Sequence, residues 1–333
     1  MNEPARITTP VEHLQAKLAG DMDRVNALIR TRMASRHAPR IPEVTAHLVE
    51  AGGKRLRPLL TLAAARLCGY EGEHHIRLAA TVEFIHTATL LHDDVVDESA
   101  RRRGRPTANL LWDNKSSVLV GDYLFARAFQ LMVETESLRV LDILANASAV
   151  IAEGEVLQLS VATDITTPED TYIQVVRGKT AALFAAATEA GAVIAGAPED
   201  QVNALRDYGD ALGIAFQIAD DLLDYGGASA GLGKNTGDDF RERKVTLPVI
   251  RAVAGADTDQ RAFWERVIGR GDQQPDDLAA AMDLMTRHGA FESTQRTALD
   301  YAARARAALA PLPDGPLRSN LAELADFVVA RLT

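Results

Sequence analysis

The spacing of apolar residues limits this chain to a helical fold along nearly its whole length. Apolar residues recur at three- and four-residue steps from the start, at Val11, Leu14, Leu18, Met22, Val25, Leu28 and Ile29, as on one face of an amphipathic helix. Similar runs predict helices near residues 43–51, 55–69, 74–97, 115–136, 138–162, 169–196, 199–224, 243–254, 257–268, 276–288, 291–309 and 317–332. Alternating strand patterns flanked by Asn-Gly or Asp-Gly turns are missing. The sequence therefore predicts an all-α fold.

The breaks between these runs are short. They fall at Arg101–Pro106, Asp164–Pro168, Gly226–Gly237, Gly269–Pro275 and Pro311–Pro316, where glycine, proline and polar residues gather. None has the length or the low complexity of an interdomain linker. Residues 1–333 are therefore predicted to form a single domain.

Charge and composition narrow the class of protein. The net charge of −10 argues against a nucleic-acid surface as the main function. Cys68 is the only cysteine, so an internal disulfide is impossible and a reducing cytosol suits the chain. The N-terminus lacks the pattern of a signal peptide, and the most apolar stretch, Ala181–Ala197, is interrupted by Thr188 and Glu189. We expect a soluble, cytoplasmic protein with no transmembrane segment, in which Ala181–Ala197 is a close-packed interior helix.

Two acidic motifs share one spacing. Asp93, Asp94 and Asp97 follow an apolar run at positions i, i+1 and i+4. On a helix Asp93 and Asp97 project from the same face, where they repel each other unless a cation lies between them. A small set of carboxylate ligands suits Mg²⁺, which also binds phosphate oxygens. The spacing recurs at Asp220, Asp221 and Asp224, so two helices together could hold several Mg²⁺ ions around one polyphosphate.

Basic residues suited to phosphate accompany the acidic motifs. Lys54 and Arg57 lie one turn apart in Gly52–Pro58, at the start of a predicted helix, and helix N-termini and guanidinium groups favour phosphate. His86 lies two turns before Asp93 on the same face. Further candidates are Arg102, Arg103, Lys179, Lys234 and Lys244. Taken singly, each is more typical of a solvated helix start or a charged loop.

In order and spacing, these motifs resemble the trans-polyprenyl diphosphate synthases, most of all the bacterial octaprenyl and decaprenyl group that makes quinone side chains. The resemblance rests on GGKRLRP, LLHDDVVDESARRRG, Lys179-Thr180, FQIADDLLD, GKNTGDD and KVTLP, and covers about residues 52–248. The C-terminal third carries no motif of this kind.

The resemblance implies an isoprenoid synthase-type helical bundle around a central cavity, with the two acidic motifs facing each other. It implies that Asp93 and Asp97 hold two Mg²⁺ ions and Asp220 a third, supported by Asp94, Asp221 and Asp224. Thr180 and Gln217 would line the reacting centre. Diphosphate-binding residues would be Arg102, Lys179 and Lys244 for the allylic substrate, and Lys54, Arg57, His86 and Arg103 for isopentenyl diphosphate. Lys234 is a further candidate for substrate binding. A homodimer is also implied.

Product length is expected to depend on the helix that carries the first acidic motif. The residues four and five before Asp93 lie about 6–7.5 Å back along the axis. They are Thr89 and Ala88, both small, although an alanine is also common in a helix this rich in alanine. With no large side chain to close a tunnel there, the resemblance implies a long product of about eight to ten isoprene units, C40–C50.

Alternative functions remain open. A shorter-chain farnesyl or geranylgeranyl diphosphate synthase would share all these motifs. A terpene cyclase or head-to-head condensing enzyme would not need a second diphosphate pocket, and a non-catalytic partner subunit of a heteromeric synthase would be expected to lack one acidic motif. A purely structural helical protein would explain the composition but not the ordered motifs.

Overall fold

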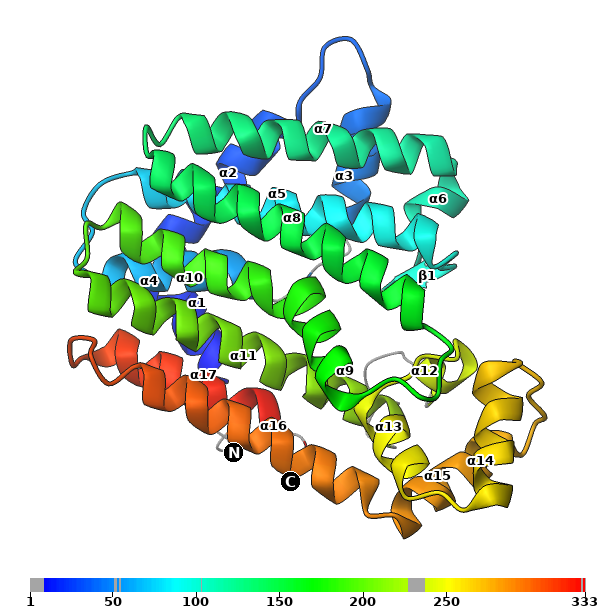
Figure 1. The fold of residues 1–333 in the computed structure, drawn as a ribbon. Helices are drawn as coiled ribbons and strands as arrows, with labels where there is room; N and C mark the ends of the chain where they lie inside the picture. The colour runs from blue at the N-terminus through cyan, green and yellow to red at the C-terminus, as the bar shows by residue number, and fades with distance from the viewer. Residues whose placement is uncertain are drawn as a thin grey trace, which may run out of the picture.

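The computed structural model describes residues 9–50, 53, 55–102, 104–226, 237–330 and 332. Helices make up almost all of it (Figure 1). They are α1 (Pro10–Lys17), α2 (Ala19–Met33), α3 (Arg40–Glu50), α4 (Leu56–Leu67), α5 (His74–Val96), α6 (Ala108–Leu111), α7 (Asn114–Val133), α8 (Leu138–Val161), α9 (Glu169–Val176), the π-helix η1 (Arg177–Ala181), α10 (Ala182–Ile194), α11 (Glu199–Tyr225), α12 (Asp238–Arg241), α13 (Leu247–Ala254), α14 (Thr258–Trp264), the π-helix η3 (Glu265–Gly269), α15 (Asp277–Arg287), α16 (Ala290–Ala308) and α17 (Pro316–Ala330). The predicted all-α fold is confirmed.

Helix α5 is enclosed because it is apolar on nearly every side. Leu78, Ala79, Ala80 and Ala88 have no exposed surface although they point in different directions around the axis. A helix that is hydrophobic all round has to be covered by others, and α2, α4, α7 and α10 pack against it. Figure 1 shows part of α5 in cyan, between α7 and α8 in this view. This packing fixes where the end of α5, with its aspartates, lies.

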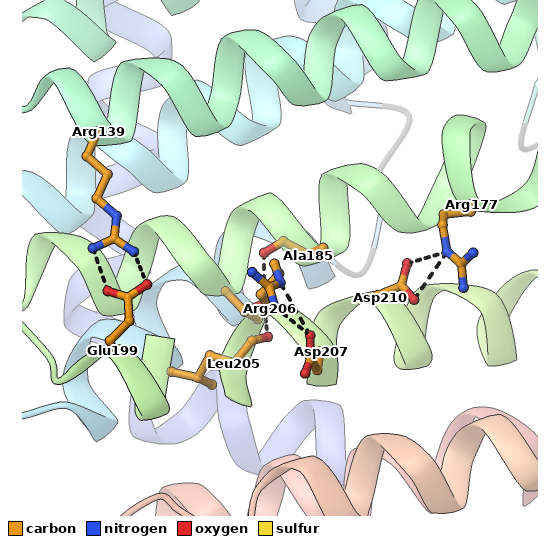
Figure 2. A network of polar contacts seen from close by, with 9 residues as sticks. Arg139, Arg177, Ala185, Glu199, Leu205, Arg206, Asp207 and Asp210 are labelled. Carbon is orange, nitrogen blue, oxygen red and sulfur yellow. Dashed lines mark hydrogen bonds and ion pairs between the residues drawn. The ribbon is translucent and has the colours of Figure 1, made fainter. Parts of the chain in front are cut away.

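Helix α10 runs between α4 and α11, as expected for the interior helix predicted at Ala181–Ala197. Helix α4 can approach α10 closely because many residues of α10 are small. A Cβ added at Gly191 would lie 2.6 Å from the backbone oxygen of Thr61 on α4. At the solvent side, Arg139 on α8 forms two hydrogen bonds with Glu199 at the start of α11, 2.7 and 2.8 Å long, as Figure 2 shows.

Several boundaries differ from those predicted. The first helix is broken at Leu18, although the apolar face continues through the break. The predicted break at Arg101–Pro106 contains a short antiparallel hairpin, β1 (Arg101–Arg102) with β2 (Arg105–Pro106). Helices α6 and α12 were not predicted, since four residues are too few to show a period. Helix α13 starts at Leu247 rather than at residue 243, because Thr246 is extended and Pro248 suits a first turn.

A second, smaller core lies in the region from α12 to α15. Phe240, Trp264, Val267 and Met285 are among its buried residues. The rest of the helices share one large cluster. The single-domain organisation stays a prediction. None of the helices in the described part of the chain is long and apolar enough to cross a membrane.

Candidate active site

The first acidic motif lies at the C-terminal end of α5. Asp93 is half-buried, Asp94 is buried and Asp97 is exposed at the C-cap. The difference follows from helix geometry, since neighbouring residues point about 100° apart while residues four apart share a face. Asp94 therefore points into the protein, and Asp93 and Asp97 share a more accessible side.

The environment of Asp93 is electrostatically unusual. Burial raises the pKa of Asp93 to about 7, although the charges of Lys179 and Arg102 oppose the rise. The carboxylates of Glu155 and Asp97 add to it. A buried carboxyl among other carboxyls gains from a nearby cation, because the cation offsets both burial and repulsion. The donor set here, oxygen ligands only, suits a hard divalent ion.

The hairpin after α5 returns a guanidinium to this motif. Arg102 Nε donates to Asp94 Oδ1 over 2.8 Å. Burial raises the pKa of Asp94, and Arg102 counters the rise. Asp94 therefore holds the hairpin and Arg102 in place beside the motif. Arg103, the next residue, lies outside the described residues, as do Lys54 and Lys234.

The second acidic motif lies near the C-terminal end of α11. Asp220 is half-buried, while Asp221 and Asp224 are buried. Asp224 Oδ2 accepts a hydrogen bond of 2.9 Å from the backbone N–H of Asp239, in α12. The backbone N–H of Gly237 donates to the carbonyl of Asp224 over 2.8 Å. Asp224 thus fixes the start of α12 against α11.

A chain of hydrogen bonds runs from Asp221 to Thr180. Gln217 Nε2 donates to Asp221 Oδ1 over 2.8 Å, and Tyr172 Oη donates to Asp221 Oδ2 over 2.6 Å. The Thr180 hydroxyl donates to Gln217 Oε1 over 2.8 Å. Burial raises the pKa of Asp221, and the bonds from Tyr172 and Gln217 oppose the rise. The predicted pair Thr180 and Gln217 is therefore in direct contact.

Lys179 and Thr180 belong to η1, a single π-helical turn between α9 and α10. Arg177, at its start, is bonded to Asp210 of α11, with 3.0 Å between Nε and Oδ1 (Figure 2). On its other side the backbone of Gly178 touches Gly154 of α8, where an added Cβ would lie 2.8 Å from the backbone nitrogen of Lys179. Only glycine at residue 154 permits this contact without displacement. The π turn is thereby held between α8 and α11.

The ammonium group of Lys179 is fixed by two side chains of α8. Its Nζ donates to Glu155 Oε2 over 2.8 Å and to Gln158 Oε1 over 2.9 Å. Since Lys179 and Glu155 both act on the pKa of Asp93, this group lies beside the first acidic motif. Sequence reasoning missed Glu155 and Gln158, which lie outside the motifs. The signal for them in the sequence is their three-residue spacing, which places both side chains on one face of α8.

Lys244 connects the two acidic motifs electrostatically. It stands in the extended segment before α13, with Nζ 2.5 Å from Glu242 and 3.7 Å from Asp239. Burial lowers the pKa of Lys244, but the carboxylates of Asp239, Glu242 and Asp97 raise it by more than burial lowers it. The net change in the pKa is therefore upward. Lys244 also lowers the pKa of Asp221. One cation therefore acts on the pKa values of carboxylates in both motifs, which places the two motifs in one electrostatic environment.

The start of α4 brings a second basic group to α5. Arg57 Nη1 lies 3.2 Å from His86 Nε2, and its guanidinium carbon lies 4.5 Å from the centre of the Phe184 ring. Arg55, in a left-handed conformation at the N-cap, forms an ion pair with the buried Glu83 of α5. Arg57 and His86, predicted from separate motifs, are thus brought together.

The two small residues before the first acidic motif differ in environment. Ala88 has no exposed surface and belongs to the main core. Thr89 is half-buried, and its hydroxyl donates to the carbonyl of His86 over 2.8 Å. Within the described residues, no three His, Cys, Asp or Glu side chains converge closely enough to hold a metal ion by themselves. An ion at Asp93 would need waters or phosphate oxygens as further ligands, as Mg²⁺ commonly does.

Comparison with known proteins gives a consistent result. The polyprenyl synthetase family model matches residues 38–285. The chain is 44% identical to the octaprenyl diphosphate synthase of Escherichia coli (strain K12) over 321 residues, covering 96% of this chain and 99% of that protein.

Two solved structures share the whole fold. A decaprenyl diphosphate synthase from Rhodobacter capsulatus is 72% identical, covers 97% of this chain and 100% of its own, and has a TM-score of 0.95. A polyprenyl synthase from Caulobacter crescentus CB15, complexed with calcium and isoprenyl diphosphate, is 55% identical with a TM-score of 0.92, and covers 98% of this chain and 100% of its own. The chain therefore belongs to the polyprenyl synthetase family.

Proposed function

We propose that this prenyltransferase makes a long-chain all-trans polyprenyl diphosphate of about C40–C50 by repeated condensation of isopentenyl diphosphate onto an allylic diphosphate. The observation that carries the proposal is full-length similarity to synthases of this class, at 72% identity for the decaprenyl enzyme and 44% for the octaprenyl enzyme. A product of this length is the side chain of a quinone, and we propose that as its use. The single cysteine, Cys68, suits action in the cytoplasm.

Mg²⁺ is the proposed cofactor, with Asp93, Asp97 and Asp220 as its ligands. The fit rests on the half-buried Asp93 carboxyl, whose raised pKa reports unfavourable ionisation without a cation. The three aspartates not assigned as ligands already accept hydrogen bonds: Asp94 from Arg102, Asp221 from Tyr172 and Asp224 from the backbone of Asp239. When bound, divalent ions supply positive charge that stabilises a departing pyrophosphate.

The two substrates would occupy two basic regions. Arg102, Lys179 and Lys244 lie beside the acidic motifs, and we assign them to the diphosphate of the allylic substrate. Lys234 is a further candidate for substrate binding. Arg57 and His86, in contact across α4 and α5, are assigned to isopentenyl diphosphate, together with Lys54 and Arg103. Guanidinium and ammonium groups both bind phosphate oxygens, and the planar guanidinium adds a fixed geometry.

The reaction follows from this arrangement. The carbon–oxygen bond of the allylic diphosphate breaks, its electrons leave with pyrophosphate, and an allylic cation remains. The double bond of isopentenyl diphosphate forms the new carbon–carbon bond, and the resulting cation loses a proton to pyrophosphate. Arg102, Lys179 and Lys244 stabilise the charge that develops on the leaving group. The oxygens of Thr180 and Gln217 face the electron-poor carbon.

A homodimer is proposed because exposed apolar residues gather on one part of the surface. Of the eleven large exposed apolar side chains among the described residues, nine lie on α6, α7 and α8: Leu110, Leu111, Val118, Leu119, Phe129, Val133, Leu138, Val156 and Leu159. Exposed apolar side chains concentrated on neighbouring helices are typical of an interface between protein chains. Sedimentation of Leu119→Glu should show dissociation at micromolar concentration. Leu299→Glu, an exposed leucine on α16, is the control and should remain dimeric.

Product sizing tests the function. Purified protein is incubated with Mg²⁺, isopentenyl diphosphate and an allylic diphosphate, and the dephosphorylated products are separated by length. We expect products of eight to ten isoprene units, which require Mg²⁺. Products that stop at C15–C20 would identify a short-chain synthase, and no elongation by the folded wild-type protein would overturn the proposed activity.

A further inference from the structure

Tyr172 lies outside every sequence motif, yet its hydroxyl reaches the second acidic motif. It belongs to α9, it is 6% exposed, and its hydroxyl donates to Asp221 Oδ2 over 2.6 Å. Asp221, on α11, is 5% exposed. A tyrosine hydroxyl is a costly group to bury, and a hydrogen bond to a carboxylate compensates for that cost. The bond joins α9 to the residue next to Asp220.

The direction of each hydrogen bond beyond Asp221 follows from chemistry. A carboxylate that accepts from Tyr172 at one oxygen also accepts at the other. The group of Gln217 that faces it over 2.8 Å must therefore be the amide NH₂. This orientation turns Gln217 Oε1 toward Thr180, whose hydroxyl has to donate to it over 2.8 Å. The Thr180 proton is thereby directed to Gln217, and the lone pairs of both oxygens remain available to positive charge.

We propose that Tyr172 is a positioning residue: through Asp221 it fixes the amide orientation of Gln217 and the hydroxyl orientation of Thr180, so that both oxygens face the cationic carbon of the allylic substrate. The inference rests on the proposed function. Without the phenol, Asp221 keeps one donor of the two and can rotate. Gln217 can then turn its NH₂ group toward the reacting carbon, where a donor repels positive charge.

The matched control is another buried tyrosine. Tyr208, on α11, has no exposed surface, and its hydroxyl donates to the carbonyl of Leu321 in α17 over 2.8 Å. Tyr208→Phe and Tyr172→Phe each remove one hydroxyl and one buried hydrogen bond. They differ in whether the lost bond leads to Gln217.

The experiment compares wild type, Tyr172→Phe and Tyr208→Phe by kinetics and by binding. Turnover and KM are measured for both substrates with Mg²⁺. Dissociation constants are measured for two unreactive analogues of the allylic diphosphate. The neutral analogue is a thiolo-diphosphate with no charge at the reacting carbon, and the ammonium analogue is a diphosphate with a positive charge at that position. Losing one orienting hydrogen bond should reduce kcat of Tyr172→Phe roughly ten-fold with both KM values nearly unchanged. The ammonium analogue should bind roughly ten-fold more weakly and the neutral analogue as in wild type.

Each outcome decides the matter. Equal weakening of both analogues, an unchanged kcat, or the same loss in Tyr208→Phe would overturn the positioning role of Tyr172. If Tyr172→Phe does not fold, Asp221→Asn takes its place, because an asparagine amide also frees Gln217. Asp221→Asn should weaken binding of the ammonium analogue and leave binding of the neutral analogue unchanged. An equal effect on both analogues overturns the inference. A wild-type protein that elongates no allylic diphosphate would overturn the proposed function instead, and the binding comparison would still be measurable.

Discussion

Replacing Asp93 by asparagine should stabilise the metal-free protein while abolishing turnover. The half-buried carboxyl of Asp93 has a pKa raised by burial from its ordinary 3.8 to about 7. In the folded protein it therefore binds a proton at pH values at which the unfolded chain has lost it. The free energy of unfolding of the wild type must then fall as pH rises from about 4 to about 7, and stay level above pH 7 as far as Asp93 is concerned.

The magnitude follows from the same pKa. A rise from 3.8 to about 7 corresponds to roughly 4 kcal/mol at 1.36 kcal/mol per pKa unit. Part of the Asp93 side chain faces solvent, and solvent screening reduces the effect to about 2 kcal/mol. Asparagine cannot ionise and has nearly the same shape. Asp93→Asn should therefore unfold about 3–5 °C above the wild type at pH 8 without metal, and the difference should shrink at pH 5.

Thermal unfolding in a chelator at pH 5 and pH 8 measures the effect. Asp142→Asn, an exposed aspartate on α8, is the control and should unfold like the wild type at both pH values. Mg²⁺ with inorganic pyrophosphate should then stabilise the wild type by mass action and Asp93→Asn much less, so that the order of stability reverses. A metal-free Asp93→Asn protein no more stable than wild type at pH 8 would refute the electrostatic argument. Wild-type turnover in Asp93→Asn at saturating Mg²⁺ would refute the ligand assignment.

Three further changes test separate parts of the site. Arg57→Ala should raise KM for isopentenyl diphosphate about ten-fold more than KM for the allylic substrate, and equal effects in steady-state kinetics would mean that the two pockets are wrongly assigned. Gly154→Ala should displace the π turn and raise KM for the allylic substrate, because its Cβ would lie 2.8 Å from the backbone nitrogen of Lys179; an unchanged KM would show that the turn tolerates displacement. Ala88→Tyr should shorten the products to C15–C20 on chromatography at a cost of about 1–3 kcal/mol of stability from overpacking, and long products from the folded variant would place the growing chain elsewhere.

The sequence predicted the longer helices well, because a helical apolar pattern is a local property. The apolar period of α7 and α8 determines which face is buried, and the long apolar run of α5 indicates a helix covered on nearly every side. All three were predicted within a few residues. The very short elements were missed, since α6, α12 and the hairpin at Arg101–Pro106 do not contain a full period. The roles of all the site residues stay predictions, and Lys54, Arg103 and Lys234 also lie outside the described part of the chain.

Contacts between distant segments could not be predicted in the same way. Glu155 and Gln158 hold Lys179 from a helix that carries no acidic motif, and Tyr172 reaches Asp221 across 49 residues of sequence. The π turn adds to the difficulty. It changes the register of the helix predicted at residues 169–196, so a 3.6-residue period does not place Lys179 and Thr180 correctly.

In both acidic motifs the first and second aspartates have different environments, and this difference follows from helix geometry. In the first, Asp94 is buried and accepts from Arg102; in the second, Asp221 is buried and accepts from Gln217 and Tyr172. Each is the second residue of its motif, and a residue one position along a helix points about 100° away from the first. The first residue can therefore face the site only if the second faces the protein. The buried second aspartate thus fixes the surrounding polar groups and leaves the first, half-buried aspartate accessible to the cations that we propose it binds.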